Sequence, residues 1–521
     1  MKGLPPEIQL LIIENLDVLD VFHLQQTCKY LYKLIEAFDH VIWRKCLQQQ
    51  CTQNGLFWPS YRKHATSDEF KDACTTNLRF RNASRKWEDR SASTIPSTVE
   101  KLEFDWVPFD EFYLVPGGRF LITLHKLFFR IWSLYPSTLR NDAPKVGYTD
   151  VYYMQCPFSG IAYANVVHGT KIELLLSGTT KSVALSLNRQ FVSPTAYRSD
   201  HEDQEMTSLL HLEITIEDGS DMVFSFRKSG LIQFLHGEGE DTPNLTILGD
   251  GNIVVFQTSS GITMAWDSAH HHCFGWRPEG IGDAVCDWEL FSNDEFVFYV
   301  NGSGVHGFKI PPLQPITEEY VTLSSFSDNR FSSSFFIPHI RPYDITDSAC
   351  IISQENCFPI SDQQPVIYII KEIEDNDDDD STTILLHWYQ FRFDSSNPGS
   401  STLTLLDTTS LKRDCRRSLS PCRTYNVWGD QVAIVWESED EDDSEQLHTS
   451  FYLSLSTIPS SPTPSSFSRA SSPNSQGKAK ENFKILPFAR YPVAPDDDTV
   501  PVPLGQNDES WVDWYDFVAK D

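Results

Sequence analysis

The spacing of apolar residues divides the chain near residue 90. Before this point apolar positions recur every three or four residues, as in helices. After residue 100 they form short runs between Gly, Asp, Asn and Pro, as in strands. Ile8, Leu11, Ile12 and Leu16 share one helix face, and Pro5 suits a first helical turn. We therefore predict an α+β multidomain protein, with an N-terminal all-α domain followed by a large all-β domain.

The first 90 residues contain three further helical patterns. A single second helix is predicted by apolar residues at alternating intervals of three and four, namely Val21, Leu24, Cys28, Leu31 and Ile35. Asp39 can cap a third, short helix that carries Ile42 and Trp43. Thr66 and Glu69 form a capping-box pattern, which predicts the start of a fourth helix.

A repeat runs through the β-rich part: a turn, a strand, a second turn and another strand. Its turns begin at residues 115, 248, 291 and 427, and the first reads Val115-Pro116-Gly117-Gly118. The intervals of 133, 43 and 136 residues are close to three, one and three units of about 44 residues, the length of a four-stranded propeller blade. Weaker copies lie at Phe158–Leu176 and Met222–Leu235. We predict a degenerate β-propeller of about six to eight blades over residues 96–456, with a pair of irregular β-sandwiches as the alternative.

Three segments of biased composition interrupt the predicted strands. Glu372–Asp380 and Glu437–Glu445 each hold seven acidic residues in nine, and we interpret both as solvated loops at hairpin tips rather than as calcium sites. In Thr457–Ser475, 12 of 19 residues are Ser or Pro, which predicts a disordered linker over residues 457–482. Residues 483–521 turn apolar again, and we expect them to return to the β-domain.

Charge changes at the same place as the hydrophobic pattern. Residues 1–90 carry 13 basic and 11 acidic side chains, whereas the rest of the 521-residue chain carries 29 and 61. A net charge of −30 repels phosphate backbones and anionic lipids, so we expect neither nucleic acid nor a membrane as a partner. The apolar run Leu10-Leu11-Ile12-Ile13 is too short for a signal peptide, so we expect none, and no apolar run is long enough to span a bilayer. The eleven scattered cysteines include no CxxC. These features predict a cytoplasmic and/or nuclear protein.

Catalytic motifs are absent from the sequence. It has no phosphate-binding loop, dinucleotide fingerprint, G-x-S-x-G or H-E-x-x-H pattern, so we predict no catalytic residue, cofactor or metal. His270-His271-His272-Cys273 is the one histidine cluster, and we interpret it as a turn, because neighbouring strand residues point to opposite faces.

A basic island stands out in the acidic part of the chain. It contains Lys412 and four arginines, which are Arg413, Arg416, Arg417 and Arg423. Arginines of this kind could bind a phosphorylated or acidic segment of a protein substrate through bidentate hydrogen bonds. The alternative, which we favour, is that they balance the neighbouring acidic residues.

The order of residues at the N-terminus resembles the F-box motif. Leu4-Pro5-Pro6-Glu7-Ile8, Asp20-Val21, Thr27-Cys28-Lys29 and Val41-Ile42-Trp43-Arg44 follow that family's elements in order and spacing. The likeness covers residues 4–47. The sequence departs from the family at Phe22-His23, where a second aliphatic residue is commoner, and at Thr27, where Val is usual.

The resemblance implies an F-box over residues 1–48, followed by a helical linker over 49–95. It implies that the F-box binds the Skp-type adaptor of a cullin–RING ubiquitin ligase, through Leu4, Pro5, Ile8, Leu11, Ile12, Leu16, Val21, Leu24, Cys28, Leu31 and Trp43. Our main hypothesis is a non-catalytic substrate receptor of an SCF-type ligase, whose β-domain brings an unidentified protein substrate close to the conjugating enzyme. Two alternatives stay open: an F-box scaffold that acts outside the ligase, and an enzyme with a helical N-terminal cap.

Overall fold

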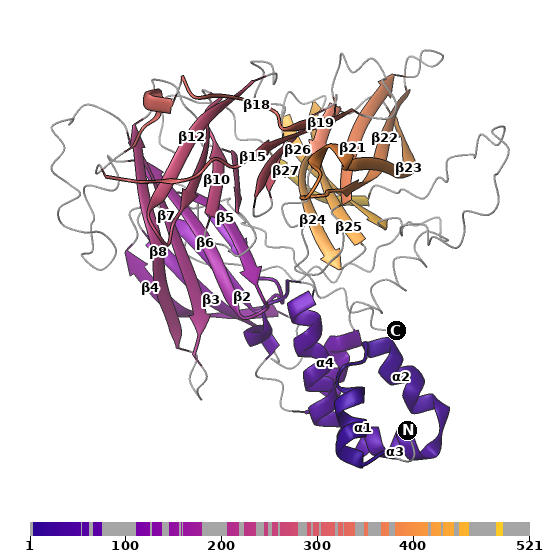
Figure 1. The fold of residues 1–521 in the computed structure, drawn as a ribbon. Coiled ribbons are helices and arrows are strands. Elements are labelled where there is room, and N and C mark those ends of the chain that lie inside the picture. The colour runs from indigo at the N-terminus through magenta and orange to yellow at the C-terminus, as the bar shows by residue number, and fades with distance from the viewer. Residues whose placement is uncertain are drawn as a thin grey trace. The chain divides into compact units, whose positions relative to one another are not determined.

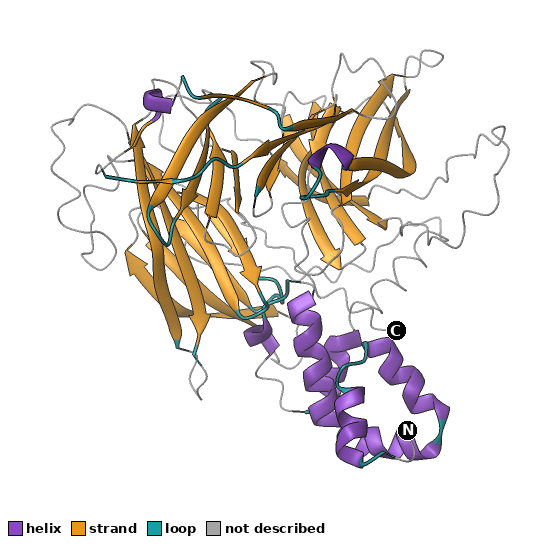
Figure 2. Ribbon diagram, viewed as in Figure 1, coloured by secondary structure: helices purple, strands orange, loops and turns teal. Residues whose placement is uncertain are grey.

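The computed structural model describes residues 4–75 and 111–492, both with gaps, the longest of which are 180–205, 353–365 and 458–485. Helices occupy the N-terminal part and strands the rest (Figures 1 and 2). The described residues fall into two compact units. The first comprises the helices, the strands before residue 236 and a short piece at 316–322, and the second comprises the other strands. The predicted Ser/Pro-rich linker lies outside the described residues, except for Thr457, which is the last residue of a strand.

The N-terminal part consists of short helices that follow one another closely. They are α1 (Pro6–Ile13), α2 (Val18–Thr27), α3 (Lys29–Ala37), α4 (Asp39–Gln53), the 3-10 helix η1 (Trp58–Tyr61) and a helix over 67–75. The predicted single second helix is wrong, because the extended backbone of Cys28 (φ −160°, ψ 155°) separates α2 from α3. The predicted short third helix is longer than expected, at 15 residues.

The capping box that predicted the last of these helices is confirmed. The backbone N–H of Glu69 donates to Oγ1 of Thr66 (3.3 Å), and the N–H of Thr66 donates to Oε2 of Glu69 (3.0 Å). These two bonds satisfy donors that the first turn of a helix otherwise leaves without a partner.

Two antiparallel sheets complete the first unit. One has the order β1 (Glu111–Leu114), β2 (Phe120–His125), β3 (Phe128–Ser137), β4 (Lys145–Gln155). The other has the order β5 (Gly160–Val167), β6 (Lys171–Thr179), β7 (Met206–Ile216), β8 (Phe224–Leu235), and β17 (Val321–Thr322) joins β8 in parallel. Each sheet is a meander of strands that are consecutive in sequence, which is the plan of a propeller blade.

The second unit contains four further sheets among the described residues. The first comprises β9 (Asn244–Ile247), β10 (Ile253–Gln257), β11 (Thr263–Asp267), β12 (His272–Glu279), β16 (Gln314–Pro315) and β18 (Arg330–Ser332). The second comprises β13 (Glu289–Ser292), β14 (Phe296–Asn301), β15 (Gly304–Lys309) and β19 (Phe335–Pro338). The third comprises β20 (Ala349–Ile352), β21 (Val366–Glu374), β22 (Ser381–Arg392) and β23 (Thr402–Asp414). The fourth comprises β24 (Ser418–Trp428), β25 (Gln431–Glu441), β26 (Leu447–Thr457) and β27 (Leu486–Pro492), while η4 (Leu323–Phe326) and η5 (Pro398–Ser400) are short 3-10 helices.

The strand order confirms the predicted fold class, helices followed by a large all-β region of blade-like sheets. The predicted turn at residues 115–118 lies between β1 and β2. The predicted turns at 291 and 427 begin too early, because Phe291 and Ser292 belong to β13, and Val427 and Trp428 to β24. Their other residues, and residues 248–251 of the remaining turn, lie outside the described parts of the chain. The described residues form six sheets, within the predicted range of six to eight blades, but the intervals of 133 and 136 residues each hold two described sheets rather than the three units of about 44 residues that the spacing suggested. The weaker copies at Phe158–Leu176 and Met222–Leu235 contribute strands to one sheet, β5–β8.

Both acidic segments lie at hairpins, but their first residues continue the strands. Glu374 pairs with Thr382 across β21 and β22, and Glu441 pairs with Leu447 across β25 and β26. The interpretation of these acidic segments as loops is therefore wrong at their beginnings. Residues 375–380 and 442–446 lie outside the described parts of the chain.

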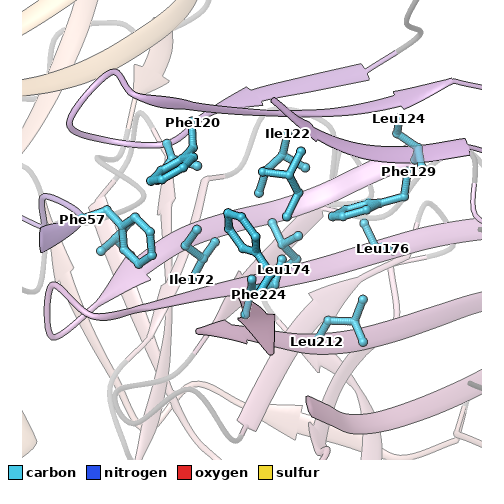
Figure 3. Packing of buried hydrophobic residues seen from close by; sticks show 14 of the residues in the cluster. Phe57, Phe120, Ile122, Leu124, Phe129, Ile172, Leu174, Leu176, Leu212 and Phe224 are labelled. Carbon is cyan, nitrogen blue, oxygen red and sulfur yellow. The ribbon is translucent and has the colours of Figure 1, made fainter. Parts of the chain in front are cut away.

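Apolar side chains fill the space between successive sheets within each unit. In the first unit, Phe120, Ile122 and Phe129 of the β1–β4 sheet pack against Leu174 and Leu212 of the β5–β8 sheet (Figure 3). In the second unit, one cluster joins the β9–β12 sheet to β14 and β15. Another cluster joins the sheet that contains β14 and β15 to β22 and β23. Face-to-face packing of consecutive meanders is how propeller blades bury their apolar surface.

Candidate functional site

Helix α1 exposes three of its aliphatic side chains, while it buries Ile13. Ile8 is 43%, Leu11 56% and Ile12 37% exposed, and Leu4, just before the helix, is 42% exposed. The same helix buries Gln9 completely. A helix on the surface of a self-sufficient domain has the opposite pattern, with its apolar stripe inside. The outer face of α1, defined here as Leu4, Ile8, Leu11 and Ile12, is therefore a surface suited to another protein.

The helices beneath this face are held by a core of their own. It contains buried side chains from every helix, among them Ile13, Val18, Val21, Leu31, Ile35, Ile42, Trp43, Leu47 and Phe70. The C-terminal turn of α1 is tied to α4, because Nε2 of Gln49 donates to the carbonyl oxygen of Glu14 (2.8 Å). The outer face therefore rests on a packed support.

Phe22, one of the two departures from the F-box pattern, has a structural role in this core. Its ring lies 4.9 Å from that of Trp43 between centroids. Nζ of Lys71 lies over both rings, 5.4 Å from Phe22 and 5.6 Å from Trp43. This cation–π arrangement attaches the helix over 67–75 to α2 and α4, so the helical part extends beyond the region covered by the resemblance.

The predicted adaptor-binding residues fall into three groups. Exposed ones are Leu4, Pro5, Ile8, Leu11 and Ile12, half-buried ones are Leu16, Leu24 and Cys28, and buried ones are Val21, Leu31 and Trp43. The buried group supports the face from below. Five further exposed apolar residues lie nearby in sequence but outside the predicted set: Leu19, Tyr30, Tyr32, Phe38 and Val41. Helical spacing alone does not reveal them, because they lie outside the main apolar stripe.

Three cysteine thiols are buried where α4 meets the helix over 67–75 and η1. Burial, with a smaller contribution from Asp17, raises the pKa of Cys46 to about 11, and burial also raises the pKa values of Cys51 and Cys74. Sγ of Cys74 donates to the carbonyl oxygen of Trp43 (3.5 Å). Thiols with raised pKa values are poor nucleophiles and poor metal ligands, so we assign these cysteines to the core.

The end of the helical part is built into the first two sheets. The N–H of Phe57 donates to the carbonyl of Pro116 in the β1–β2 turn (2.8 Å), and the N–H of Trp58 donates to that of Gly169 in the β5–β6 turn (2.7 Å). The side chain of Phe57 is fully buried in the cluster between the two sheets, 6.0 Å from the ring of Phe120 (Figure 3). We call residues 55–61 the joint.

The other predicted sites have less structural support. Arg413 lies on β23 and Arg423 on β24, while Arg416 and Arg417 lie outside the described residues, so the arginine site stays a prediction. His270 and His271 lie in the turn between β11 and β12, where Nδ1 of His270 and Oδ2 of Asp267 are 2.8 Å apart. Within the described residues, no group of three potential ligands could hold a metal ion, and no helix is long and apolar enough to cross a membrane.

Comparisons with known proteins agree with the position of the helical site. The F-box-like family model matches residues 1–49. No curated protein is similar enough to this sequence to count as a relative. Among solved structures, the chain is similar to Hsv2 of Kluyveromyces lactis, at 10% identity over 57% of this chain and 96% of that one, with a TM-score of 0.19.

Two further solved structures show likenesses of the same order. Sqt1 from Chaetomium thermophilum matches at 9% identity, over 64% of this chain and 68% of that one, with a TM-score of 0.26. The C-terminal WD40 domain of Sif2 matches at 8% identity, over 56% and 84%, with a TM-score of 0.20. Because these TM-scores are low, we describe the β-region from its own strand order. Residues 1–49 are an F-box-like domain, which implies a ubiquitin-ligase adaptor role, and the chain continues from it into a large β-rich region.

Proposed function

We propose that this chain is the substrate-recognition subunit of an SCF-type cullin–RING ubiquitin ligase. The outer face of α1 would bind the Skp-type adaptor, and the β-region would bind the protein to be ubiquitinated. In this role the chain catalyses no reaction itself and raises the concentration of the substrate near the conjugating enzyme.

One observation carries the proposal: α1 exposes three aliphatic side chains, Leu4 just before it exposes a fourth, and the helix buries a glutamine, all within the segment that the F-box-like family model matches. A contiguous apolar face of this kind is costly in water unless a partner covers it. The core below the face is already complete, so a partner gains apolar contact area without any need for the helices to rearrange.

The test is a charge placed in the outer face. Because Ile8 is 43% exposed, Ile8→Asp should leave the helices folded. In a docked complex, however, the carboxylate would be buried without a partner, which costs several kcal/mol. We expect co-precipitation of the Skp-type adaptor and of cullin to fall at least tenfold, with the circular dichroism spectrum unchanged.

Val223→Asp is the matched control, because Val223 is an aliphatic residue before β8 that is 50% exposed and lies outside the F-box-like segment. It should bind the adaptor as the wild type does. If Ile8→Asp also binds normally, the docking assignment is wrong. If the wild type binds the adaptor but never cullin, a scaffold that acts outside the ligase replaces the receptor hypothesis.

A further inference from the structure

Gln9 is out of place by polarity. It lies in the middle of α1, where its neighbours in sequence are aliphatic, and it is one of two side chains that this helix buries, the other being Ile13. Its Oε1 has no hydrogen-bond partner among the described residues. Burying an unpaired amide oxygen is unfavourable, and an apolar side chain of similar length would avoid that cost. If the buried amide group of Gln9 has a role, that role must therefore lie with its nitrogen, Nε2.

Nε2 of Gln9 donates to the carbonyl oxygen of Leu4, at 2.6 Å. The backbone bonds of the helix do not extend to this carbonyl, since the N–H groups of Ile8 and Gln9 both donate to Pro5 (3.1 Å each). The side chain of Gln9 thus ties the residue before the helix to the helix itself. Leu4 and Pro5, which we call the arm, precede the first helical turn, and both are exposed.

We propose that Gln9 is a positioning residue that orders the arm, so that Leu4 and Pro5 form part of the docking face before the partner arrives. The inference rests on the proposed function, because the arm is counted here as part of the adaptor-binding surface. An arm that is already ordered loses less conformational entropy when it is covered, and the complex gains affinity without any new contact. Gln9 itself is buried and acts only through Leu4.

The test compares two variants of the full chain. Gln9→Met keeps the length of the side chain and removes the donor. Gln49→Met is the matched control, because Gln49 makes the same kind of bond, from Nε2 to the carbonyl oxygen of Glu14 (2.8 Å), at the other end of α1. Each variant is measured for thermal stability, for amide hydrogen exchange over residues 4–10, and for affinity to the purified Skp-type adaptor. Pro5 and Pro6 have no N–H, so the exchange of Ile8 and Gln9, whose N–H groups donate to the carbonyl oxygen of Pro5, reports on the order of the arm.

We expect Gln9→Met to melt at or above the wild-type temperature and to exchange at least threefold faster over residues 4–10. It should bind the adaptor about three- to tenfold more weakly, which is the loss expected when a docking segment is no longer ordered in advance. Gln49→Met should melt lower and bind within about twofold of the wild type. If Gln9 had only a structural role, Gln9→Met would lower the melting temperature, and the affinity for the adaptor would fall with it.

Unchanged exchange in Gln9→Met, or faster exchange with wild-type affinity, overturns the positioning role. So does a loss of affinity that Gln49→Met reproduces. If the wild type itself does not bind the adaptor, the proposed function fails. The hydrogen-exchange measurement then decides separately whether Gln9 orders Leu4 and Pro5. Unchanged exchange would reject that role as well.

Discussion

At the scale of one residue, His211 links the stability of the first unit to pH. It lies on β7 and is fully buried. Burial lowers its pKa to about 4, with the charge of Glu213 acting weakly in the opposite direction. The ordinary value of 6.5 applies when the chain is unfolded, so between pH 6.5 and pH 4 the unfolded chain binds more protons at this position than the folded chain does. The contribution of His211 to folding therefore becomes less favourable as the pH falls through this window.

We expect His211→Gln to be less sensitive to acid than the wild type. Between pH 7.5 and pH 5, its free energy of unfolding should fall by about 2 kcal/mol less, which is the linkage penalty for a histidine with these two pKa values. The measurement is urea denaturation of both proteins at both pH values. Glu173, whose pKa is raised by burial, acts in the opposite direction but is common to both proteins. Parallel pH profiles would show that His211 does not carry the effect.

At the scale of elements, two glycines test how closely the end of α4 packs against the β5–β6 turn. Gly169 in the β5–β6 turn has a φ of +69°, and a Cβ there would lie 3.1 Å from the backbone of Cys51 and Thr52 in α4. Gly118 in the β1–β2 turn has nearly the same φ, +70°, with nothing within 4 Å. Both need the left-handed conformation, but only Gly169 also has another backbone in close approach.

Gly118→Ala should cost about 1 kcal/mol of stability through backbone strain alone. Gly169→Ala should cost about 1 to 3 kcal/mol more, because the end of α4 has to move away from the turn. Denaturation midpoints of the two variants measure the difference directly. Equal midpoints would mean that α4 does not press on the β5–β6 turn as tightly as the structure shows.

The elements also show which parts of the fold were predictable. Glycine-rich turns such as Val115-Pro116-Gly117-Gly118 mark the start of a sheet, because left-handed backbone is required there, and Gly117 and Gly118 do have positive φ. The β5–β6 turn contains Gly169 but also His168 at positive φ, and this position gave no sequence signal. The break at Cys28 was missed because Val21 and Leu31 keep their helical spacing across it and both reach the core.

The candidate site was predictable in composition but not in orientation. Apolar spacing identified the residues of α1 and α2, and the F-box resemblance supplied a partner for them. Spacing does not say which apolar residues a domain keeps for its own core, so Val21, Leu31 and Trp43 were grouped with the exposed Ile8 and Leu11. The joint was also missed, since Phe57 is a lone aromatic residue whose burial depends on turns that are far away in sequence.

For the whole molecule, the joint makes the helical part and the first two sheets one structural unit. Phe57 and Trp58 donate backbone hydrogen bonds to two different turns, and Nη1 of Arg119 donates to the carbonyl oxygen of Ser60 (3.4 Å). A linker of free helices would leave the docking face mobile relative to these sheets. Here both belong to the same compact unit, which these hydrogen bonds hold together.

This arrangement changes where the β-region can be cut. The sequence places the boundary near residue 96, but a fragment that starts at residue 97 lacks Phe57 and leaves a cavity between the first two sheets. Removing a buried phenylalanine side chain costs about 3 to 5 kcal/mol. We therefore expect the 97–521 fragment to melt at least about 5 °C below a fragment of residues 54–521. The full-length variant Phe57→Ala keeps the backbone of the joint and should melt at a lower temperature than the wild type for the same reason. Its control is Trp58→Phe, which keeps an aromatic ring next to Phe57 and should melt at a temperature close to that of the wild type. If both fragments melt at the same temperature, the joint contributes nothing to the β-region, and the boundary near residue 96 is adequate.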